Sequence, residues 1–453
     1  MREAGPPAEQ PPLRARIDAD VVVVGGGYLG MWTAWHLLQR EPSSRVVLLE
    51  RHRCGFGPSG RNGGFVTPYW EKLPAMIERF GEAAAVRLAE ASERAVDGIG
   101  AFCEREGVDA WYRPCEEVEM ATAPSQDGMW SEAVEACRRL APPGMYRELS
   151  RSEVAGYARS PRFGGGAAVH RTATVQPARL AFGLRERLLA RGVRVFEGSP
   201  VERVRDTGAD VTVETRGGAV TARRAVLAVN HVAGGLRPFR RMVSTASSHI
   251  VLTPPVPREL EAIGWTGGAA LRDCRTMLHY FRTTNDHRIA FGWGGGRMAY
   301  GTRRRAELDV DADVRARTEG ALRRFFPELA HVPIDSAWGG PIDVSPIRLP
   351  QYRAVGRTLA GFGFTGNGVG PSYLGGQILS AMALDVRDAL TRLPLVEPTV
   401  PRFPPEPLRF LGGAAIRAAL VRADDDAEAG RATSPPVAFV AGLPKRLGMS
   451  LPR

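Results

Sequence analysis

The chain has 453 residues, of which 44% are apolar and 24% are charged, and it carries a formal net charge of +11. It contains no run of about eighteen apolar residues, which excludes a membrane-spanning helix and indicates a globular chain long enough for two domains. The positive charge comes from scattered arginines, with Lys72 and Lys445 as the only lysines, so nucleic-acid binding is not predicted.

The N-terminal segment and the cysteines bear on the cellular location. Residues 1–17 are rich in proline and lack the apolar part of a signal peptide, so a disordered N-terminus is expected. The five cysteines are irregularly spaced, and none forms a CxxC pair. This pattern predicts neither a metal site nor a redox pair, and it fits a protein of the reducing cytoplasm.

Residues 20–50 have the pattern of a βαβ unit that binds a dinucleotide. Residues 21–24 are all valine and predict a buried strand, residues 31–38 predict an apolar helix, and residues 46–49 predict a second strand. Glu50 ends this second strand, where a carboxylate can bind both hydroxyls of a ribose.

The glycines between the first strand and the helix have separate expected roles. Gly25 makes the tight turn, Gly27 lets the backbone approach a pyrophosphate, and Gly30 lets the helix pack closely on the strand. The helix N-terminus, with Tyr28 and Leu29, then presents free N–H groups and a positive dipole end to the phosphates.

A long glycine-rich stretch, residues 51–66, follows the acid directly and decides which dinucleotide is expected. It has no strand or helix pattern, and its backbone N–H groups and small residues suit wrapping an extended anionic cofactor. The residues expected along that cofactor are Arg51, Ser59, Gly60, Arg61, Asn62, Gly63 and Gly64.

Residues 20–66 resemble the FAD-dependent amine and amino-acid oxidoreductases of the D-amino-acid oxidase superfamily. The similarity is greatest to the gamma-glutamylputrescine oxidase-like branch, which carries the hexapeptide Ser-Gly-Arg-Asn-Gly-Gly found here at residues 59–64. The resemblance implies that FAD is bound, and that this hexapeptide runs along its pyrophosphate and ribityl chain and ends beside the isoalloxazine.

The resemblance continues along almost the whole chain. Val201 lies in a segment that matches the family's loop at the adenine, and residues 338–346 match its Trp-Gly-Gly strand. A second glycine-rich turn then opens a helix over residues 371–384. In the family this turn places a helix N-terminus at the flavin pyrimidine ring, where a reduced flavin is negatively charged. The residues that match it are Gly366, Asn367, Gly368 and Val369.

These segments predict an α/β fold with a discontinuous, Rossmann-like FAD-binding domain and a second, α+β substrate domain built on an antiparallel sheet. The FAD-binding domain is expected over residues 18–80, 160–235 and 335–398, and the substrate domain over residues 81–159 and 236–334. Residues 399–453 predict a C-terminal helical extension, with a helix over 407–421 and a flexible acidic segment over 424–428.

Strand-like runs at residues 248–253, 276–282 and 287–293 predict the sheet that faces the flavin. An arginine there would clamp a carboxylate, and an aspartate would hold an ammonium group, although packing or a surface ion pair is the alternative for each. The substrate-side candidates are His249, Arg272, Asp273, His279, Tyr280 and Arg282, and Tyr69 and Trp70 could form a wall of the pocket.

The resemblance implies oxidation of the C–N bond of an amine or amino acid to an imine, which water hydrolyses, with O2 reoxidising the flavin and forming H2O2. The flavin performs the redox step, so no acid–base pair is required if the amine binds neutral. Non-covalent FAD is expected, because no cysteine follows Cys274 and residues 61–62 lack the histidine that some relatives use for attachment.

Lys72 is the one lysine that could assist the reaction with oxygen, as a lysine does in several amine oxidases of the family; a solvated surface position is the alternative. A dehydrogenase with another electron acceptor, a flavin monooxygenase and a flavoprotein without activity also remain open. The sequence identifies neither the substrate nor the oligomeric state.

Overall fold

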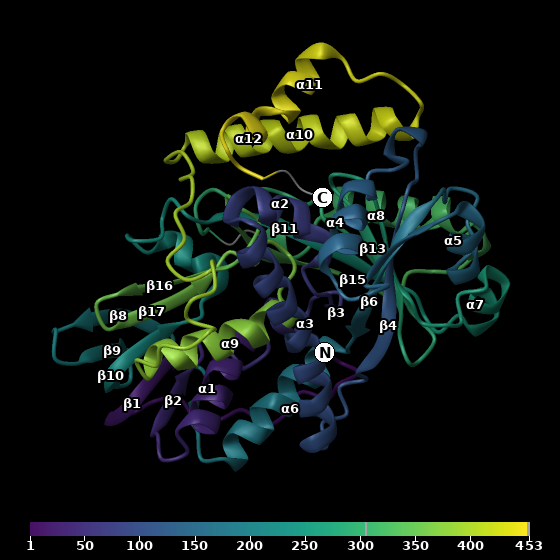
Figure 1. Cartoon of the computed structure of the whole chain (residues 1–453). Coiled ribbons are helices and arrows are strands. Elements are labelled where there is room, and N and C mark those ends of the chain that lie inside the picture. Colours follow the sequence, from purple (N-terminus) through teal and green to yellow (C-terminus); the bar gives the residue numbers. More distant parts are fainter. Residues whose placement is uncertain (304–305, 451–453) are drawn as a thin grey trace.

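The computed structural model describes residues 1–303 and 306–450, and it contains two sheets that lie side by side with helices around them (Figure 1). The first sheet has eight strands, with the path β16-β17-β10-β1-β2-β7 and with β8 and β9 attached to β10. Its strands are β1 (Arg16–Val24), β2 (Val46–Leu49), β7 (Arg194–Phe196), β8 (Val201–Asp206), β9 (Val211–Thr215), β10 (Ala219–Leu227), β16 (Gln351–Val355) and β17 (Thr358–Phe362).

The central strands β2, β1, β10 and β17 run parallel, as expected for a dinucleotide-binding domain. The four valines of β1 are buried because both faces of the sheet are covered: Val21 and Val23 pack on the side of α1, and Val22 and Val24 pack in a second apolar cluster on the opposite face. Helices α1 (Tyr28–Arg40) and α9 (Val369–Ala383) cross closely on one face. The close approach needs Gly376, since a Cβ there would lie 2.6 Å from the Trp32 backbone. Helix α6 (Pro177–Ala190) packs beside α1.

The second sheet has nine strands in the order β15-β11-β14-β13-β12-β4-β6-β3, with β5 paired to β6. All of its pairs are antiparallel except β12 with β4. Its strands are β3 (Phe65–Val66), β4 (Arg113–Met120), β5 (Tyr146–Leu149), β6 (Gly166–Thr174), β11 (Ser244–Leu252), β12 (Ala270–Asp273), β13 (His279–Thr283), β14 (Ile289–Trp293) and β15 (Ser336–Val344).

Aromatic side chains fill the core on the outer face of this sheet. Phe281 and Phe291 stack with ring centroids 5.0 Å apart, and Phe325 of α8 (Ala312–Phe325) meets both edge-on. The other α-helices described before the C-terminal extension are α2 (Leu73–Phe80), α3 (Glu82–Arg105), α4 (Ser131–Leu140), α5 (Arg151–Tyr157) and α7 (Pro257–Ile263).

The C-terminal extension forms a separate layer along one side of the molecule (Figure 1). Helix α10 (Leu408–Glu428) lies against loops of the second sheet, where Asp424 accepts the N–H groups of Thr276 and Met277. Helix α11 (Pro435–Ala441) packs on α10 before α12 (Leu443–Arg446). None of the helices in the described part of the chain is long and apolar enough to cross a membrane.

The predicted domain limits differ from the sheets in three places. The strands β3, β6 and β15 were expected in the FAD-binding domain, but each pairs within the second sheet. The reason is clearest for β15, which is in register with β11 over its full length from residue 336 to residue 344. In addition, α3 lies in the expected substrate domain but packs against α9 of the first domain.

The two segments expected to be flexible are ordered. In the N-terminal segment Leu13 is buried, its N–H donates to Ser199 Oγ at 2.9 Å, and the N–H of Gln10 donates to Glu197 Oε2 at 2.8 Å. The acidic segment 424–428 continues α10 rather than ending it. Both expectations followed local composition, whereas distant partners fix both segments.

Candidate cofactor and substrate site

A single continuous cavity of about 760 Å³ lies between the two sheets. One end of it is lined by the β1–α1 turn and Glu50, and its middle by residues 57–67 of the glycine-rich stretch. Its far wall includes the β11 and β13 strands and the inner face of α10. A cavity of this size, shared by both domains, has room for an extended cofactor and a small substrate.

The β1–α1 turn has the geometry that a dinucleotide requires. Gly25 has φ of +109°, and a Cβ there would lie 2.3 Å from the carbonyl oxygen of Ala228. A Cβ at Gly30 would lie 2.0 Å from the carbonyl oxygen of Gly25, so this glycine serves close packing. Gly27 differs from both, because its Cβ would meet only Ser59 Oγ, at 3.0 Å, and would otherwise project into the cavity.

The Glu50 and Ser59 side chains beside this turn are fixed by hydrogen bonds from backbone N–H groups. The Glu50 carboxylate accepts the N–H groups of Gly26, at 2.7 Å, and His52, at 2.8 Å, which fixes it at the cavity wall. Ser59 Oγ accepts the N–H of Tyr28 at 2.8 Å and thus caps the start of α1. The Tyr28 hydroxyl points away and donates to Pro177 O at 2.7 Å, so only the Tyr28 backbone faces a cofactor.

Asn62 shapes the middle of the glycine-rich stretch. Its amide nitrogen donates to the carbonyl oxygens of Pro58, at 3.1 Å, and Ser59, at 2.8 Å, while its Oδ1 accepts the N–H of Gly64 at 2.8 Å. One side chain therefore closes the loop on itself. Trp338 Nε1 donates to Arg61 O at 2.8 Å and ties the same loop to β15.

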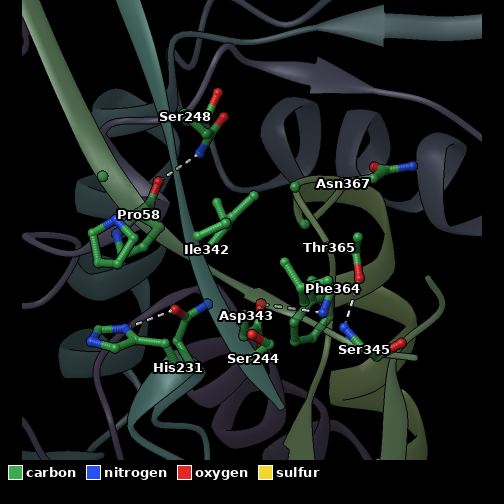
Figure 2. Close-up of a pocket in the computed structure, with 18 of the residues that line it drawn as sticks. Pro58, His231, Ser244, Ser248, Ile342, Asp343, Ser345, Phe364, Thr365 and Asn367 are labelled. Carbon is green, nitrogen blue, oxygen red and sulfur yellow. Dashed lines mark hydrogen bonds between the residues drawn. The ribbon is translucent and has the colours of Figure 1, made fainter. Parts of the chain in front are cut away.

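Asp343 organises the second glycine-rich turn, and sequence reasoning gave it no role beyond its place in the Trp-Gly-Gly strand. Its carboxylate accepts the N–H group of Gly363 at 2.6 Å. It also accepts the N–H group of Phe364 at 3.2 Å (Figure 2). Burial raises the pKa of Asp343 to about 7, against these hydrogen bonds. In the same turn Thr365 Oγ1 accepts the N–H of Ser345 at 3.1 Å (Figure 2).

The residues present fit FAD. The turn leaves open space at Gly27 beside the α1 N-terminus, a fixed carboxylate stands one strand away, and a second helix N-terminus, that of α9, lines the same cavity. Gly30 and Gly60 serve packing and lie outside the cavity wall. The predicted cofactor residues that line it are Gly25, Gly27, Tyr28, Leu29, Glu50, Arg51, Ser59, Arg61, Asn62, Gly63, Gly64, Val201, Gly366, Asn367, Gly368 and Val369.

The substrate-side candidates divide by the alternation of their strands. Tyr280 faces the cavity, and its hydroxyl pairs with Ser248 Oγ at 2.7 Å. His279 faces the aromatic core, where its Nδ1 lies 2.6 Å from Asp273 Oδ2. His249 is also buried, on the side of β11 that faces away from the cavity, and its Nε2 lies 3.0 Å from Ser247 Oγ. The structure therefore places neither histidine, nor Asp273, in the cavity wall.

Arg272 lines the cavity, but its charge is already engaged. Its guanidinium forms ion pairs with Glu71, with Glu117 at 2.9 Å and with Glu119 at 3.0 Å. A guanidinium surrounded by three carboxylates is not available to clamp a substrate carboxylate. Burial raises the pKa of Glu117, and the neighbouring Arg272 acts in the opposite direction.

Tyr69 and Trp70, expected to form a wall of the pocket, lie in the hydrophobic core and not in the cavity. The Trp70 indole donates to Glu93 at 2.9 Å. Lys72 departs from expectation in the opposite direction. A solvated surface position was the alternative for it, but it lines the cavity. Its ammonium lies 5.1 Å from the centre of the Tyr69 ring.

Arg348 was missed entirely by sequence reasoning. It lines the cavity and follows β15 in a loop, with φ of +58°. It is electrostatically coupled to Lys72 and to Glu71, and burial lowers its pKa to about 10. Within residues 1–303 and 306–450 its guanidinium makes no hydrogen bond or close ion pair. The only signal in the sequence was an arginine in the turn after a matched strand.

Arg282 acts behind the glycine-rich stretch. Its guanidinium donates to the carbonyl oxygens of Gly63, at 2.5 Å, Val175, at 2.7 Å, and Thr283, at 3.1 Å. It lies outside the cavity wall, so it is a positioning residue and not a candidate for substrate contact.

Replacement of Arg282 by methionine is expected to destabilise the fold by about 3 kcal/mol, because buried carbonyl oxygens lose their donor. FAD affinity should fall with it, because the carbonyl of Gly63 belongs to the loop beside the cofactor. Thermal unfolding and FAD titration measure the two effects. Arg216→Met is the control, since that side chain is 91% exposed. A parental melting temperature for Arg282→Met would contradict this role.

The fold and the cavity together define a class of protein, a dinucleotide-dependent enzyme whose second domain faces the cofactor. Residues 20–382 match the family described as DAO, FAD dependent oxidoreductase. The chain therefore belongs to this family, and FAD is its cofactor.

Individual relatives cover most of the chain. It is 30% identical over 408 residues to the probable oxidoreductase OrdL of Rhizobium meliloti, covering 89% of this chain and 90% of the relative. It is also 30% identical to the gamma-glutamylputrescine oxidoreductase of Escherichia coli, over 82% of this chain and 84% of the relative. Among solved structures, glycine oxidase from Geobacillus kaustophilus aligns with a TM-score of 0.67 at 19% identity, covering 82% of this chain and 96% of the other.

Proposed function

We propose that this enzyme oxidises the C–N bond of an amine or amino acid to an imine, which water then hydrolyses. FAD, when bound, accepts the two electrons of this oxidation and passes them to an acceptor. The observation that carries the proposal is the position of the second domain's polar residues, which line the same cavity as the FAD-binding residues. The similarity to gamma-glutamylputrescine oxidoreductase and to glycine oxidase supports an amine or amino-acid substrate.

The substrate also carries an anionic group in this proposal. Arg348 and Lys72 place two neighbouring positive charges in the cavity wall, and Glu71 is the carboxylate coupled to both. Like charges held together in a partly buried wall are costly, and an anion relieves that cost. Arg348 offers a planar fork for a carboxylate, whereas Lys72 supplies a point charge. Of the two arginines first expected in this role, Arg272 is paired with three carboxylates and Arg282 is engaged by backbone carbonyl oxygens outside the cavity wall.

No protein base is assigned to the oxidation. If the amine binds in its neutral form, the chain has only to bind it, orient it and exclude water. Tyr280, with its hydroxyl fixed by Ser248, is the polar group on the sheet that suits contact with a bound substrate. We further propose a non-covalent cofactor and a cytoplasmic location.

Oxygen is the proposed acceptor, with Lys72 supplying a positive charge where oxygen becomes negative. Burial, together with the charge of Arg348, lowers the pKa of Lys72 to about 8. The lysine is therefore cationic below that pH and neutral above it. The rate of reoxidation by O2 is expected to fall as the pH rises through about 8, and Lys72→Met should give a slow rate without this dependence.

Stopped-flow reoxidation of the reduced enzyme measures this rate across pH. Lys445→Met is the matched control, because Lys445 is exposed and is the only other lysine. If Lys72→Met reoxidises at the parental rate, the lysine has no role with oxygen. If the parent itself reacts only with artificial acceptors, the enzyme is a dehydrogenase.

Product analysis tests the proposed reaction. The FAD-loaded enzyme is incubated in air with amines and amino acids, and the carbonyl product and H2O2 are both quantified. Equal amounts of the two are expected from one class of substrate. Carbonyl without H2O2 would retain the oxidation but require another acceptor, and a hydroxylated product would indicate a monooxygenase.

A further inference from the structure

The inner face of α10 forms part of the wall of the substrate cavity. The residues of this helix that line the cavity follow a helical repeat, so they lie on one side of it. They form two adjacent rows, one of Leu408, Gly412, Ile416 and Leu420 and one of Arg409, Gly413 and Arg417. The matched family segment ends at residue 382, so this wall lies outside it.

The two arginines of this face are committed to holding the helix. Arg409 Nη1 donates to the carbonyl oxygens of Arg240, at 2.6 Å, and Val243, at 3.0 Å. The Arg417 guanidinium donates to the carbonyl oxygens of Gly295 and Gly296. With these charges engaged, the row that begins at Leu408 presents only apolar atoms to the cavity.

The far end of α10 is fixed to the second domain by charges. Asp424 accepts the N–H groups of Thr276, at 2.9 Å, and Met277, at 2.8 Å. Asp425 pairs with Arg275 at 2.7 Å. Glu428 pairs with Arg162 at 3.0 Å and with Arg324 at 3.3 Å, and Arg275 and Arg317 complete the cluster. The helix is thus a fixed wall.

The wall opposite this face is also apolar. Met277, Leu278 and Met298 line the cavity from the second domain, and Met298 Cε would be the nearest atom, at 2.9 Å, to a Cβ on Gly413. A Cβ on Gly412 would meet no atom within 4 Å. The chain therefore leaves space along α10 that its own side chains do not fill.

We propose that this space, named here the α10 subsite, binds an apolar substituent of the substrate and selects for a long alkyl or aryl group. The α10 subsite is the part of the cavity lined by Gly412, Ile416, Leu420, Met277, Leu278 and Met298. The inference rests on the proposed function, in which Arg348 binds the anionic end of the same molecule. The substrate class is thus an amine with both an anionic group and a sizeable apolar substituent.

Binding of butanoate and decanoate to the FAD-loaded enzyme tests the α10 subsite. Neither carboxylate has an amine to oxidise, so flavin difference spectra report binding without turnover. Decanoate is expected to bind at least about tenfold more tightly than butanoate, because each buried methylene is worth roughly fourfold in affinity. Gly412→Leu should weaken decanoate binding at least about tenfold and change butanoate binding less than about twofold.

The matched control is Leu411→Ala on the same helix, which alters an outward side chain that is 58% exposed. It should bind the two carboxylates like the parent. Equal weakening of both carboxylates by Gly412→Leu, or no weakening of decanoate, would overturn the α10 subsite. If decanoate binds as expected but no amine is oxidised, the proposed function fails and the α10 subsite stands. If amines are oxidised but decanoate binds no better than butanoate, the α10 subsite fails and the proposed function stands.

Discussion

Replacement of Gly27 by valine is expected to reduce FAD affinity at least about 100-fold, which corresponds to roughly 2.7 kcal/mol, while the protein stays folded. Gly27 has φ of −82° and ψ of −179°, an extended conformation that valine adopts without strain. Its Cβ would meet only Ser59 Oγ among the protein atoms, so the new methyl groups would occupy the space assigned to the pyrophosphate. Fluorescence titration of the apoprotein with FAD measures the loss.

The control for this variant separates cofactor exclusion from damage to the fold. Gly267→Val places the same side chain at an exposed loop position where a Cβ meets nothing within 4 Å. It should bind FAD like the parent, and both variants should keep the parental far-UV circular dichroism. Tight FAD binding by Gly27→Val would show that the pyrophosphate does not pass this turn.

Replacement of Arg348 by alanine is expected to lower kcat/KM for amines that carry a carboxylate by roughly 10- to 100-fold, since a charge-assisted contact contributes about 1.5–3 kcal/mol. The effect should appear mainly in KM if the arginine binds the substrate and its transition state equally. Amines of similar size without an anionic group should lose little, because they make no contact with the guanidinium. Steady-state kinetics on matched pairs of substrates measures this difference.

Two further variants separate the role of the Arg348 guanidinium from the general effect of removing an arginine. Arg348→Lys keeps the charge but loses the fork, and it should fall between the parent and Arg348→Ala. Arg258→Ala removes an exposed arginine of α7 and should match the parent. Equal losses for anionic and uncharged amines in Arg348→Ala would argue for a structural role of this loop rather than a binding site.

The features that sequence reasoning identified are those set by local backbone constraints. Gly25, with its positive φ, and Gly30, with its 2.0 Å clearance, can be recognised because only glycine fits such positions. In the second glycine-rich turn, Gly363 and Gly366 likewise have positive φ, a conformation that favours glycine. The parallel order of β2, β1 and β10 follows from the βαβ pattern and its right-handed connection.

Features that depend on distant partners could not be predicted in this way. Lys72 is buried in the cavity wall near Arg348, 276 positions further along the chain, and Arg272 pairs with carboxylates from two other segments. Asp425 and its acidic neighbours looked like a flexible tail because their arginine partners are scattered through the second domain. Residues that form long-range ion pairs follow no helical or strand periodicity, so a sequence pattern does not reveal them.

The strand β13 shows where more could have been inferred. Side chains alternate along a strand, so His279 and Tyr280 could not both face the flavin. The structure puts Tyr280 and Arg282 on the side of the glycine-rich stretch, and His279 with Phe281 in the core. Applying this alternation would have removed either His279 or the pair of Tyr280 and Arg282 from the candidates.

The most direct test of amine oxidation by FAD is the visible spectrum of the purified protein during anaerobic titration with amines. We expect a flavin absorption band at about 450 nm, from a flavin that acid precipitation releases into solution and that an anionic amine with an apolar substituent reduces and bleaches without oxygen. A protein that cannot be reconstituted with FAD, or one whose flavin no amine or amino acid reduces, would contradict this expectation.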